Sequence, residues 1–595
     1  MKKSDQSHVF SPEEHLSGIR HSCAHLLAAA VKQLWPEAKN AIGPAVENGF
    51  YQDFDMGEVK ISEDDFPAIE KKMKEILKGW GAFVVKEVPV ERAKKDFADN
   101  PYKLELIEEF GQQGKTITEN NPGNFLDLCK GGHAEDPRKE LQHCKLMSIA
   151  GAYWRGDDKR PMLTRIYGTA FLTKEELRVH LIMLEEAKKR DHKKLGVDLD
   201  LFTFSDLVGA GLPLWTPKGT LLRNALDEFV WELRRQHGYE KVEIPHITKK
   251  DLYETSGHWD KYKDDLFRIK TREGHEFAMK PMNCPHHTQI YKRKQWSYRE
   301  LPQHYCNTTM CYRDEQSGEL LGLSRVRGFT QDDAHVFCRI SQTKEEVQKI
   351  WDIVHTFYGT FGLNLRLRLS LRDPEHPEKY LGNQEHWDKA ESILRKIAQA
   401  NKTEYFEAPG EAAFYAPKLD FLAKDSIGRE WQVATIQLDV NMPDRFDLTC
   451  VNEQNEPERI VMIHAAIMGA IERFLSVIIE HFAGEFPVWL SPVQVAILPV
   501  GLDHQEFALT LRDQLKQAGL RVEVDLSGES VGKKIRMASK QKIPYVLVVG
   551  EKEMKSDTLA VRVRRQEEVV ELKKVDFLQQ VKQLVNQRSL ELGLK

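Results

Sequence analysis

Apolar positions recur along this chain at two spacings, which predict helices in some segments and strands in others. Residues 19–34 carry apolar side chains at helical spacing, as an amphipathic helix does. Residues 174–194 repeat leucine at helical spacing among many charges, which indicates a connecting helix with a solvated charged face. A third helix is predicted where Leu222, Leu226, Val230 and Leu233 form one stripe, before a strand that ends at Pro245.

The last part of the chain has a different pattern. Apolar runs at 493–500, 522–526, 545–549 and 559–563 alternate with helical segments of roughly 10–15 residues. This alternation predicts a small α/β domain. Before about residue 170 the short strands and helices are of the α+β type. We therefore expect four parts: an α+β domain at 1–170, a linker helix at 171–199, a large central domain at 200–487 and an α/β domain at 488–595.

Composition is ordinary for a globular protein, with 41% apolar and 30% charged residues among 595. The sequence contains no apolar run of about twenty residues, so neither a membrane span nor a secretory signal is expected. Eight cysteines without paired spacings favour a reducing compartment, with the cytoplasm as the expectation. A net charge of −5 argues against a protein that simply coats nucleic acid.

The most informative segment is a predicted strand, polar loop and strand between residues 311 and 337. Arg313 and Arg325 offer planar guanidinium groups that suit phosphate oxygens. Glu315 can accept a hydrogen bond from an exocyclic amine, and Phe329 offers a face on which a base can stack. A hairpin with a charged solvent loop would explain one Arg–Glu pair, but it explains the whole combination poorly. The segment indicates a nucleotide held on an antiparallel sheet.

This segment resembles the second signature motif of class II aminoacyl-tRNA synthetases, in the form found in the threonyl-tRNA synthetase family. Other stretches resemble the same family in order along nearly the whole chain. They are residues 21–25, 48–51, 127–133, 152–157, 256–259, 280–285 and 462–474. The resemblance implies an α+β multidomain fold, with an antiparallel-sheet catalytic core, an α+β editing domain and a C-terminal α/β anticodon-binding domain.

The resemblance also implies the activation chemistry, in which threonine and ATP form an adenylate before transfer to a threonine-specific tRNA. The matching ATP-binding residues are Arg313, Glu315, Arg325, Phe329 and Arg473, with Mg²⁺ on the phosphates. The threonine-binding matches are Met282, Gln331, Asp333, Tyr415 and Gln437, and the catalytic matches are Arg313, Arg473, Lys418 and His258, the last implicated in transfer. In relatives the first motif, which residues near 209–245 resemble, builds a homodimer interface; an ordinary core helix is the alternative for this segment.

Cys284, His335 and His464 match the family's ligands for one Zn²⁺ per subunit. Spacing alone would not single them out, because they lie far apart and lack a local pair. Three protein ligands leave zinc positions open for a substrate. Threonine could use its amino group and hydroxyl, whereas valine has no hydroxyl to offer.

Serine does have a hydroxyl and differs from threonine by one methyl group, worth roughly 1–3 kcal/mol, so a second sieve is expected. His21 and His25 share one face of a helix, and Cys129 and His133 supply two further ligand types. From the residues alone this set suggests zinc. In the family the same cluster, with Lys103 and Asp127, is linked to hydrolysis of seryl-tRNA, so whether it binds metal stays open; two buried histidines and a structural thiol are the alternative.

The C-terminal matches are Arg536, Glu553 and Arg562, the expected anticodon contacts, while residues 525–530 depart from the family pattern. His286 stands where a glycine is usual, and Gly132 where a proline is usual. The ubiquitin-like module that bacterial relatives carry before the editing region is expected to be missing here.

Two rivals remain. One is a class II synthetase for another amino acid, such as serine or proline. The other is a synthetase-like RNA-binding regulator without catalysis. The three zinc-ligand matches argue against the first rival, and retention of Arg313 and Arg473 argues against the second.

Overall fold

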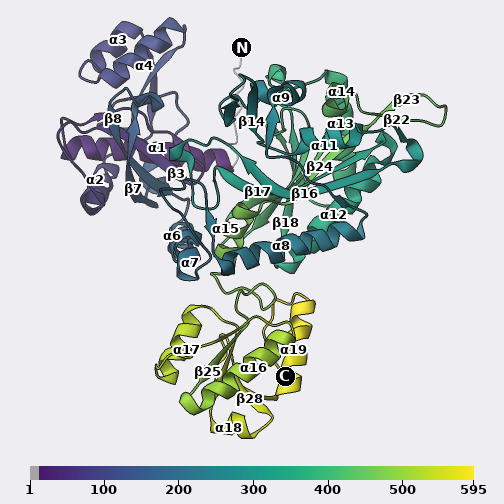
Figure 1. Ribbon diagram of the computed structural model, residues 1–595. Helices are drawn as coiled ribbons and strands as arrows, with labels where there is room; N and C mark the ends of the chain where they lie inside the picture. The colour runs from purple at the N-terminus through teal and green to yellow at the C-terminus, as the bar shows by residue number, and fades with distance from the viewer. Residues whose placement is uncertain (1–11) are drawn as a thin grey trace. The chain divides into compact units, whose positions relative to one another are not determined.

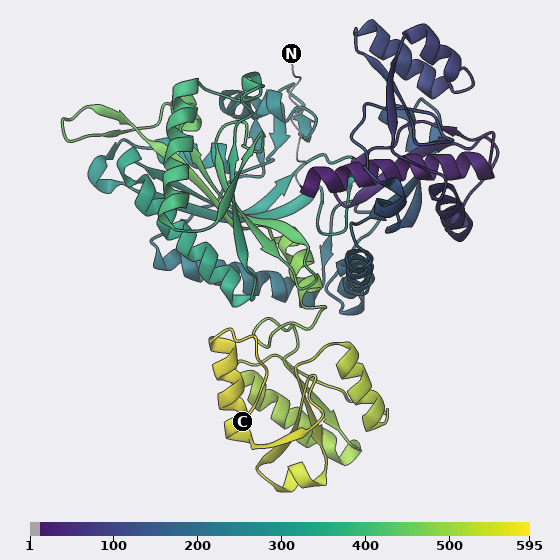
Figure 2. The ribbon, with the colours of Figure 1, turned by 180° about the vertical axis from the view of Figure 1, so that it is seen from behind.

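The computed structural model describes residues 12–595, and its contacts divide the chain into two compact units that meet between Glu185 and Glu186. The division falls inside the predicted linker. The α+β multidomain class predicted above is confirmed (Figures 1 and 2). Within residues 12–595, no helix combines the length and the apolar character that crossing a membrane requires.

The first unit is built around helix α1 (Pro12–Leu34), which begins seven residues before the predicted start. It packs with α2 (Phe66–Leu77) against an antiparallel sheet. The strands of that sheet, in order, are β1 (Lys39–Asn40), β3 (Gly49–Asp55), β8 (Met162–Ala170) and β7 (Cys144–Tyr153), with β2 (Ala45–Val46) paired to β3. A run of apolar and alanine residues from Ile19 to Val31 fills the core between these layers.

A smaller layer completes the first unit. It consists of the antiparallel strands β4 (Val84–Val88), β5 (Ile117–Asn121) and β6 (Asp127–Leu128), with helices α3 (Val90–Asp96) and α4 (Pro101–Gln112). Asn100 caps α4 by accepting hydrogen bonds from the backbone of Tyr102 and Lys103. The cap fixes Lys103 in the first turn of α4. From there its side chain reaches Asp127, which also contacts His25 of α1.

Residues 174–194 do not form the single solvated helix that their leucine spacing predicted. Helix α6 (Lys174–Arg190) ends at Arg190, and α7 (His192–Asp198) begins after the single residue Asp191. The Asp191 carboxylate accepts the Lys193 N–H and so caps α7, which explains the break. His192 is only 3% exposed, so this end of the segment is not a solvated face.

The second unit contains a large sheet whose strand order is β11, β16, β17, β24, β21, β20, β18 and β19. The strands span Glu240–Lys241, Gln303–Tyr312, Gly328–Cys338, Val461–Ala470, Glu430–Asp439, Lys418–Lys424, Leu365–Leu371 and Tyr405–Pro409 in that order. Pairing is antiparallel from β16 to β18. The predicted strand–loop–strand around residues 311–337 is confirmed as β16 and β17.

One face of this sheet is covered by helices, which bury the largest apolar core (Figure 1). They are α8 (Pro217–Gln236), α12 (Thr343–Thr360), α13 (Gln384–Ala400) and α15 (Ile471–His481). The predicted leucine–valine stripe lies on α8 and is buried. Elements near the other face include α9 (Lys250–Ser256), α10 (His258–Lys261), α11 (Cys284–Lys292) and α14 (Asn441–Arg445), with strands β12 (Ile247–Lys249), β13 (Arg268–Lys270) and β14 (Glu276–Met279).

The C-terminal part has the predicted α/β character. Its sheet runs β26 (Val522–Val524), β25 (Val495–Pro499), β27 (Tyr545–Val549), β28 (Thr558–Val563) and β29 (Val569–Lys573). Strand β25 lies parallel to both β26 and β27, while β28 and β29 return antiparallel. Strand β29, which was not predicted, follows β28 as a hairpin. The helices are α16 (Gln505–Gln517), α17 (Val531–Lys540), α18 (Glu551–Lys555) and α19 (Lys574–Asn586).

Candidate functional site

Strand register places four polar side chains in one row across the large sheet. His335 on β17 pairs with His464 on β24, His464 pairs with Gln437 on β21, and Gln437 pairs with Lys418 on β20. Residues directly opposite each other on neighbouring strands project to the same face. The period of two along a strand adds Gln331 and Asp333 of β17 to that face. The row therefore brings together residues that are far apart in sequence.

Cys284, at the start of α11, lies next to this row and forms a buried group of three with His335 and His464. Its sulfur and one nitrogen from each of His335 and His464 all lie within 4.8 Å of one another. The Nε2 of His335 is 3.1 Å from Nδ1 of His464. The other nitrogen of His464 lies 3.0 Å from Asp439, a carboxylate that fixes the ring's orientation as second partners of metal-binding histidines do. A thiol and two imidazoles in this arrangement fit Zn²⁺.

A cavity of about 270 Å³ opens beside this group. Its lining includes every predicted threonine-binding residue together with the three zinc-ligand candidates, Lys418 and Arg313. The predicted threonine-binding set in the lining is Met282, Gln331, Asp333, Tyr415 and Gln437. The buried Oε1 atoms of Gln331 and Gln437 and the buried Nε of Arg313 have no protein partner among the described residues. Buried polar atoms of this kind point to a polar ligand.

Burial sets the ionisation of the groups around the cavity. It raises the pKa of Asp333 to about 6, so its carboxyl remains largely ionised at neutral pH. Burial also raises the pKa of the Cys284 thiol well above its ordinary value and lowers that of His335. A neutral imidazole is the form that binds metal, whereas the thiol must lose its proton to a bound cation.

The residues expected to bind ATP form a less complete arrangement. The guanidinium of Arg313 lies 5.1 Å from the ring centre of Phe329. Arg325 is exposed and donates a hydrogen bond to Glu315 at 2.7 Å. Arg473 is exposed in the first turn of α15. Of the predicted ATP contacts, Arg325 and Glu315 are therefore paired with each other in this structure.

His258, expected to act in transfer to tRNA, is fully buried and is not part of the cavity lining among the described residues. Its Nδ1 lies 2.7 Å from the Ser256 hydroxyl, and its ring packs near Phe414 and Tyr415. Burial lowers the pKa of His258 to about 3, which makes it a neutral imidazole.

The N-terminal cluster of His21, His25, Cys129 and His133 is brought together in the first unit, with ligand atoms within 4.8 Å of one another. The Cys129 sulfur lies 3.3 Å from Nε2 of both His21 and His133. Although burial would raise it, hydrogen bonds from His133, His21 and His25 lower the pKa of the Cys129 thiol to about 3. The cluster therefore holds a thiolate at neutral pH.

Lys103 and Asp127 join this cluster, as the sequence predicted. The Asp127 carboxylate lies 2.9 Å from Nδ1 of His25 and 2.6 Å from Nζ of Lys103. Burial would lower the pKa of His25, but Asp127 and Cys129 raise it to about 9. Two cations and two anions thus balance one another inside the unit. A cavity of about 810 Å³ adjoins them and includes His21, His25, Lys103, Asp127 and Cys129 in its lining.

Gly132 has φ of +78°, a left-handed conformation that a proline, with φ near −65°, cannot adopt. The departure from the family's usual proline therefore comes with a local backbone that only glycine adopts readily. His286, the other departure, is buried in α11 and contacts the Thr248 hydroxyl. It is two residues from Cys284 but is not part of the cavity lining among the described residues.

The predicted anticodon residues lie on three elements of the C-terminal part. Arg536 is exposed on α17 and Arg562 is exposed on β28. Glu553 lies on α18, and its carboxylate accepts the Gly550 N–H at 2.9 Å. The two arginines are thus open to an anionic partner, whereas Glu553 caps its own helix.

Several functional neighbours were missed by sequence reasoning. Asp439 orients His464, Asn283 donates to Asp333 at 3.2 Å, and His287 lies 2.8 Å from His335. Asn40 donates to Asp127 in the N-terminal cluster at 3.1 Å. Asp439 lies two positions after Gln437 on one strand, so period two could have indicated it. Asn40 carries no such signal, because a fold contact alone brings it there.

Comparison with known proteins agrees with this geometry. Residues 267–482 match the family of tRNA synthetase class II core domains (G, H, P, S and T), and residues 494–584 match anticodon binding domains. The threonine–tRNA ligase of Cytophaga hutchinsonii is 48% identical over 96% of this chain and 89% of its own length. That of Gloeobacter violaceus is 49% identical over 93% of this chain and 90% of its own length.

A solved structure, the RNA binding domain of threonyl-tRNA synthetase from Cryptosporidium parvum Iowa II, superposes with a TM-score of 0.64 at 36% identity. It covers 67% of this chain and 99% of that one. Sequence identity to these ligases is near one half over almost the whole chain, and the class II core and anticodon binding domain follow in the matching order. This excludes the alternative of a synthetase for serine or proline. The chain belongs to the threonyl-tRNA synthetase family of class II aminoacyl-tRNA synthetases.

Proposed function

We propose that this protein joins threonine to its tRNA at the expense of ATP, through a threonyl-adenylate, and hydrolyses seryl-tRNA at the N-terminal cluster. The observation that carries the first part is the row of His335, His464, Gln437 and Lys418, closed by Cys284 on a cavity that Arg313 also lines. The three candidate metal ligands and the guanidinium group of Arg313 thus line one small cavity. The relatives' activity supports the same conclusion.

Amino-acid choice follows from the polarity of the cavity. Ionised Asp333 can accept hydrogen bonds from the substrate's ammonium or hydroxyl group, and Asn283 holds that carboxylate in place. Valine would leave these polar partners unpaired, which is the condition under which an isostere is strongly rejected. Serine would satisfy them. Zn²⁺ bound by Cys284, His335 and His464 would supply Lewis-acid binding of the substrate's amino and hydroxyl groups.

Adenylate formation joins a carboxylate oxygen of threonine to the α-phosphorus of ATP, while the bond to pyrophosphate breaks and pyrophosphate leaves. Mg²⁺ bound with ATP would neutralise part of the phosphate charge. Two anions must approach, so the site needs fixed positive charge. Arg313 supplies a fork whose Nε is buried and lacks a protein partner. The backbone N–H of Arg313 donates to the Arg327 carbonyl, which fixes the backbone from which the Arg313 side chain extends, directly after the end of β16. Arg325 and Arg473 would hold the outer phosphates once Arg325 leaves Glu315.

The partners are ATP, L-threonine and a threonine-specific tRNA, with Arg536 and Arg562 as contacts for its anticodon. We also propose a homodimer formed through the segment that includes α8, and a cytoplasmic location. The cytoplasmic location agrees with the absence of disulfide bonds among the eight cysteines, all of which lie within the described residues. Both are tested by standard means: mass measurement in solution and cell fractionation.

The test of activation is pyrophosphate exchange with a panel of amino acids. Threonine should support exchange, serine should support it more weakly, and valine and proline should not. Metal content should be one zinc per subunit after purification without added metal. Exchange that depends on proline or serine but not on threonine would contradict the proposal.

Editing is proposed for the N-terminal cluster because activation admits serine and because this cluster belongs to a separate unit. Burial lowers the pKa of His133, so its neutral imidazole can take a proton from water. The water oxygen would bond to the ester carbon of seryl-tRNA. The ester bond to the ribose would break, and the ribose oxygen would take a proton from the imidazolium of His25.

The test of editing is deacylation of pre-formed Ser-tRNA. The parent should clear it, and a variant with His21→Ala and His25→Ala should not. Threonine-dependent exchange should stay within about twofold of the parent in that variant, because the two clusters lie in different units. Equal deacylation by parent and variant would show that the cluster is structural.

A further inference from the structure

The loop between β16 and β17 ends in a tight turn that carries Arg325. Leu321 and Arg325 exchange backbone hydrogen bonds across this turn, at 3.1 and 3.3 Å, so residues 322–324 form its tip. The Leu323 side chain is fully buried in the main core. The position of the Arg325 backbone is therefore set by whatever holds the tip.

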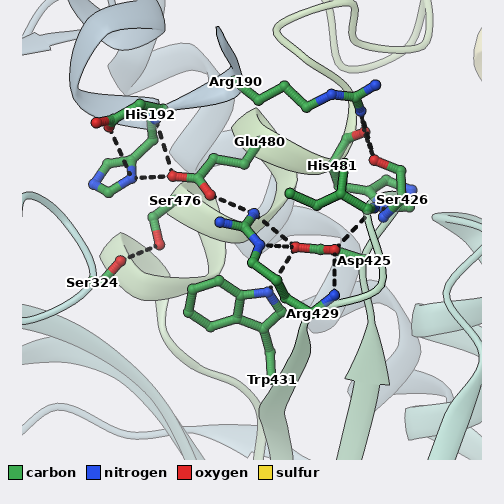
Figure 3. A network of polar contacts seen from close by, with 12 residues as sticks. Arg190, His192, Ser324, Asp425, Ser426, Arg429, Trp431, Ser476, Glu480 and His481 are labelled. Atoms are coloured by element: carbon green, nitrogen blue, oxygen red, sulfur yellow. Dashed lines mark hydrogen bonds and ion pairs between the residues drawn. The ribbon is translucent and has the colours of Figure 1, made fainter. Parts of the chain in front are cut away.

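His192, at the start of α7, holds this tip from outside the loop. Its Nε2 accepts the backbone N–H of Leu323 at 3.0 Å. Figure 3 shows its other contact, in which Nδ1 lies 2.7 Å from Oε1 of Glu480. Because Nε2 accepts a hydrogen bond, the ring proton resides on Nδ1 and is donated to Glu480. Both nitrogens thus have protein partners. The group of Asp191, His192 and Glu480, whose ligand atoms lie close together, is a hydrogen-bonded hub and not an ion site.

Glu480 lies on α15, the helix that carries Arg473 in its first turn, and a second side-chain contact joins α15 to the same tip. The hydroxyls of Ser324 and Ser476 are 2.9 Å apart. Glu480 is held from its other side by Arg429, whose guanidinium lies 2.5 Å from Oε2 (Figure 3). Burial would raise the pKa of Glu480, but His192 and Arg429 lower it, so the hub contains a carboxylate.

The tip fits against His192 only because residue 322 is glycine. Gly322 has φ of +51°, and a Cβ added there would lie 2.3 Å from Nε2 of His192. Real Cβ atoms essentially never approach that closely, so any side chain would displace the imidazole or the turn. Glycine here serves the close approach of backbone to ring, which a solvent loop would not need.

We propose that His192 is a positioning residue for the nucleotide site: it sets the backbone of the turn that presents Arg325 relative to α15, which presents Arg473. This inference rests on the proposed use of the two arginines for ATP phosphates. The network holds the turn with Arg325 and the helix with Arg473 in place before the nucleotide binds. It thereby reduces the conformational entropy that the protein loses on binding. The role belongs to binding of ATP and not to binding of threonine, since the hub contacts none of the threonine-site side chains among the described residues.

The experiment measures threonine-dependent pyrophosphate exchange with His192→Ala, His192→Gln and Gly322→Ala. A lost hydrogen bond worth about 1.4 kcal/mol corresponds to about tenfold. His192→Ala should therefore raise KM for ATP about tenfold and leave KM for threonine within about twofold. His192→Gln should restore most of the ATP affinity, because its amide can accept from Leu323 and donate to Glu480. Gly322→Ala should reproduce the raised KM while His192 is still present.

The matched control is His304→Ala. His304 also pairs with a glutamate: its Nε2 lies 2.6 Å from the carboxylate of buried Glu346 and its side chain is 10% exposed, but it does not contact the turn or α15 among the described residues. It should lower the unfolding midpoint as His192→Ala does, without raising KM for ATP. If both alanine variants lose stability and neither changes KM for ATP, His192 is merely structural and the proposal is wrong.

Two further outcomes are informative. If His192→Ala does not fold, the comparison of His192→Gln with Gly322→Ala decides, and an unchanged KM for ATP in Gly322→Ala overturns the proposal. If the parent itself shows no threonine-dependent exchange, the proposed activation function fails. In that case direct binding of ATP, measured by calorimetry on the same variants, still tests whether His192 positions the nucleotide site.

Discussion

The low pKa of the Cys129 thiol makes a measurable prediction about its chemistry. With a pKa of about 3 against an ordinary value of 9.0, Cys129 is almost wholly thiolate at pH 6, whereas an ordinary thiol would be only about 0.1% thiolate there. The thiolate is the form that reacts with iodoacetamide. Between pH 5.5 and 7.5 an ordinary thiol should react about 100-fold faster at the upper end. Cys129 should change by less than about twofold.

The slope with pH is the quantity to measure, and not the rate at a single pH. Nucleophilicity falls with thiol pKa at a Brønsted coefficient of about 0.4–0.5, so a shift of about six units removes most of the gain in ionised fraction. The assay is mass spectrometry of the peptide containing Cys129 after timed alkylation. Cys129→Ser supplies the blank. His133→Ala removes one hydrogen bond to the sulfur and should restore part of the slope.

A tenfold rise in rate per pH unit in the parent protein would refute the reasoning. It would show that the three imidazoles do not stabilise a Cys129 thiolate. The proposed charge balance within the N-terminal cluster would then also be wrong. A flat profile in the parent and in His133→Ala alike would show that His21 and His25 suffice. In either case the unfolded protein, alkylated in denaturant, gives the ordinary slope as an internal reference.

The remaining predictions concern four other side chains. Arg313→Lys keeps the charge but loses the fork, so exchange should fall by at least about 100-fold, as expected for a preorganised donor worth roughly 3 kcal/mol; a rate near the parent's would remove its phosphate role. Cys284→Ser should lower bound zinc, measured by metal analysis, together with threonine activation, and full activity of metal-free protein would contradict this. Asp127→Ala leaves buried Lys103 unpaired and should cost about 3–5 kcal/mol in urea unfolding. The folded pKa of His25 is raised to about 9, so its charge contributes stability that is complete below its unfolded pKa of 6.5 and lost as pH rises through 9; urea titrations of the parent and His25→Ala should converge over that window.

Sequence reasoning reached the N-terminal cluster and the three candidate zinc ligands by different routes. His21 and His25 are one helical turn apart, so their shared face was visible in the chain itself. Cys284, His335 and His464 meet only because β17 pairs with β24 and because α11 begins beside them, and no spacing reports that. Resemblance to a family supplied those residues.

The segment at 174–194 shows what the pattern could not predict. Its leucine spacing indicated one helix with a solvated charged face, yet a single capping aspartate ends it and turns His192 inward. Whether a polar residue faces solvent or a buried partner depends on a contact more than a hundred residues away, here Leu323. Amphipathic periodicity carries no such information.

The proposed amino-acid selectivity depends on strand register, because His335, His464, Gln437 and Lys418 align across four neighbouring strands. Deleting one residue from β24 would turn His464 to the helix-covered face and bring a neighbour into its place, with the other three side chains unchanged. Insertions in the loops between these strands leave the alignment intact. This architecture can therefore acquire length freely at its margins, but it can change its preferred amino acid only by replacing side chains one position at a time.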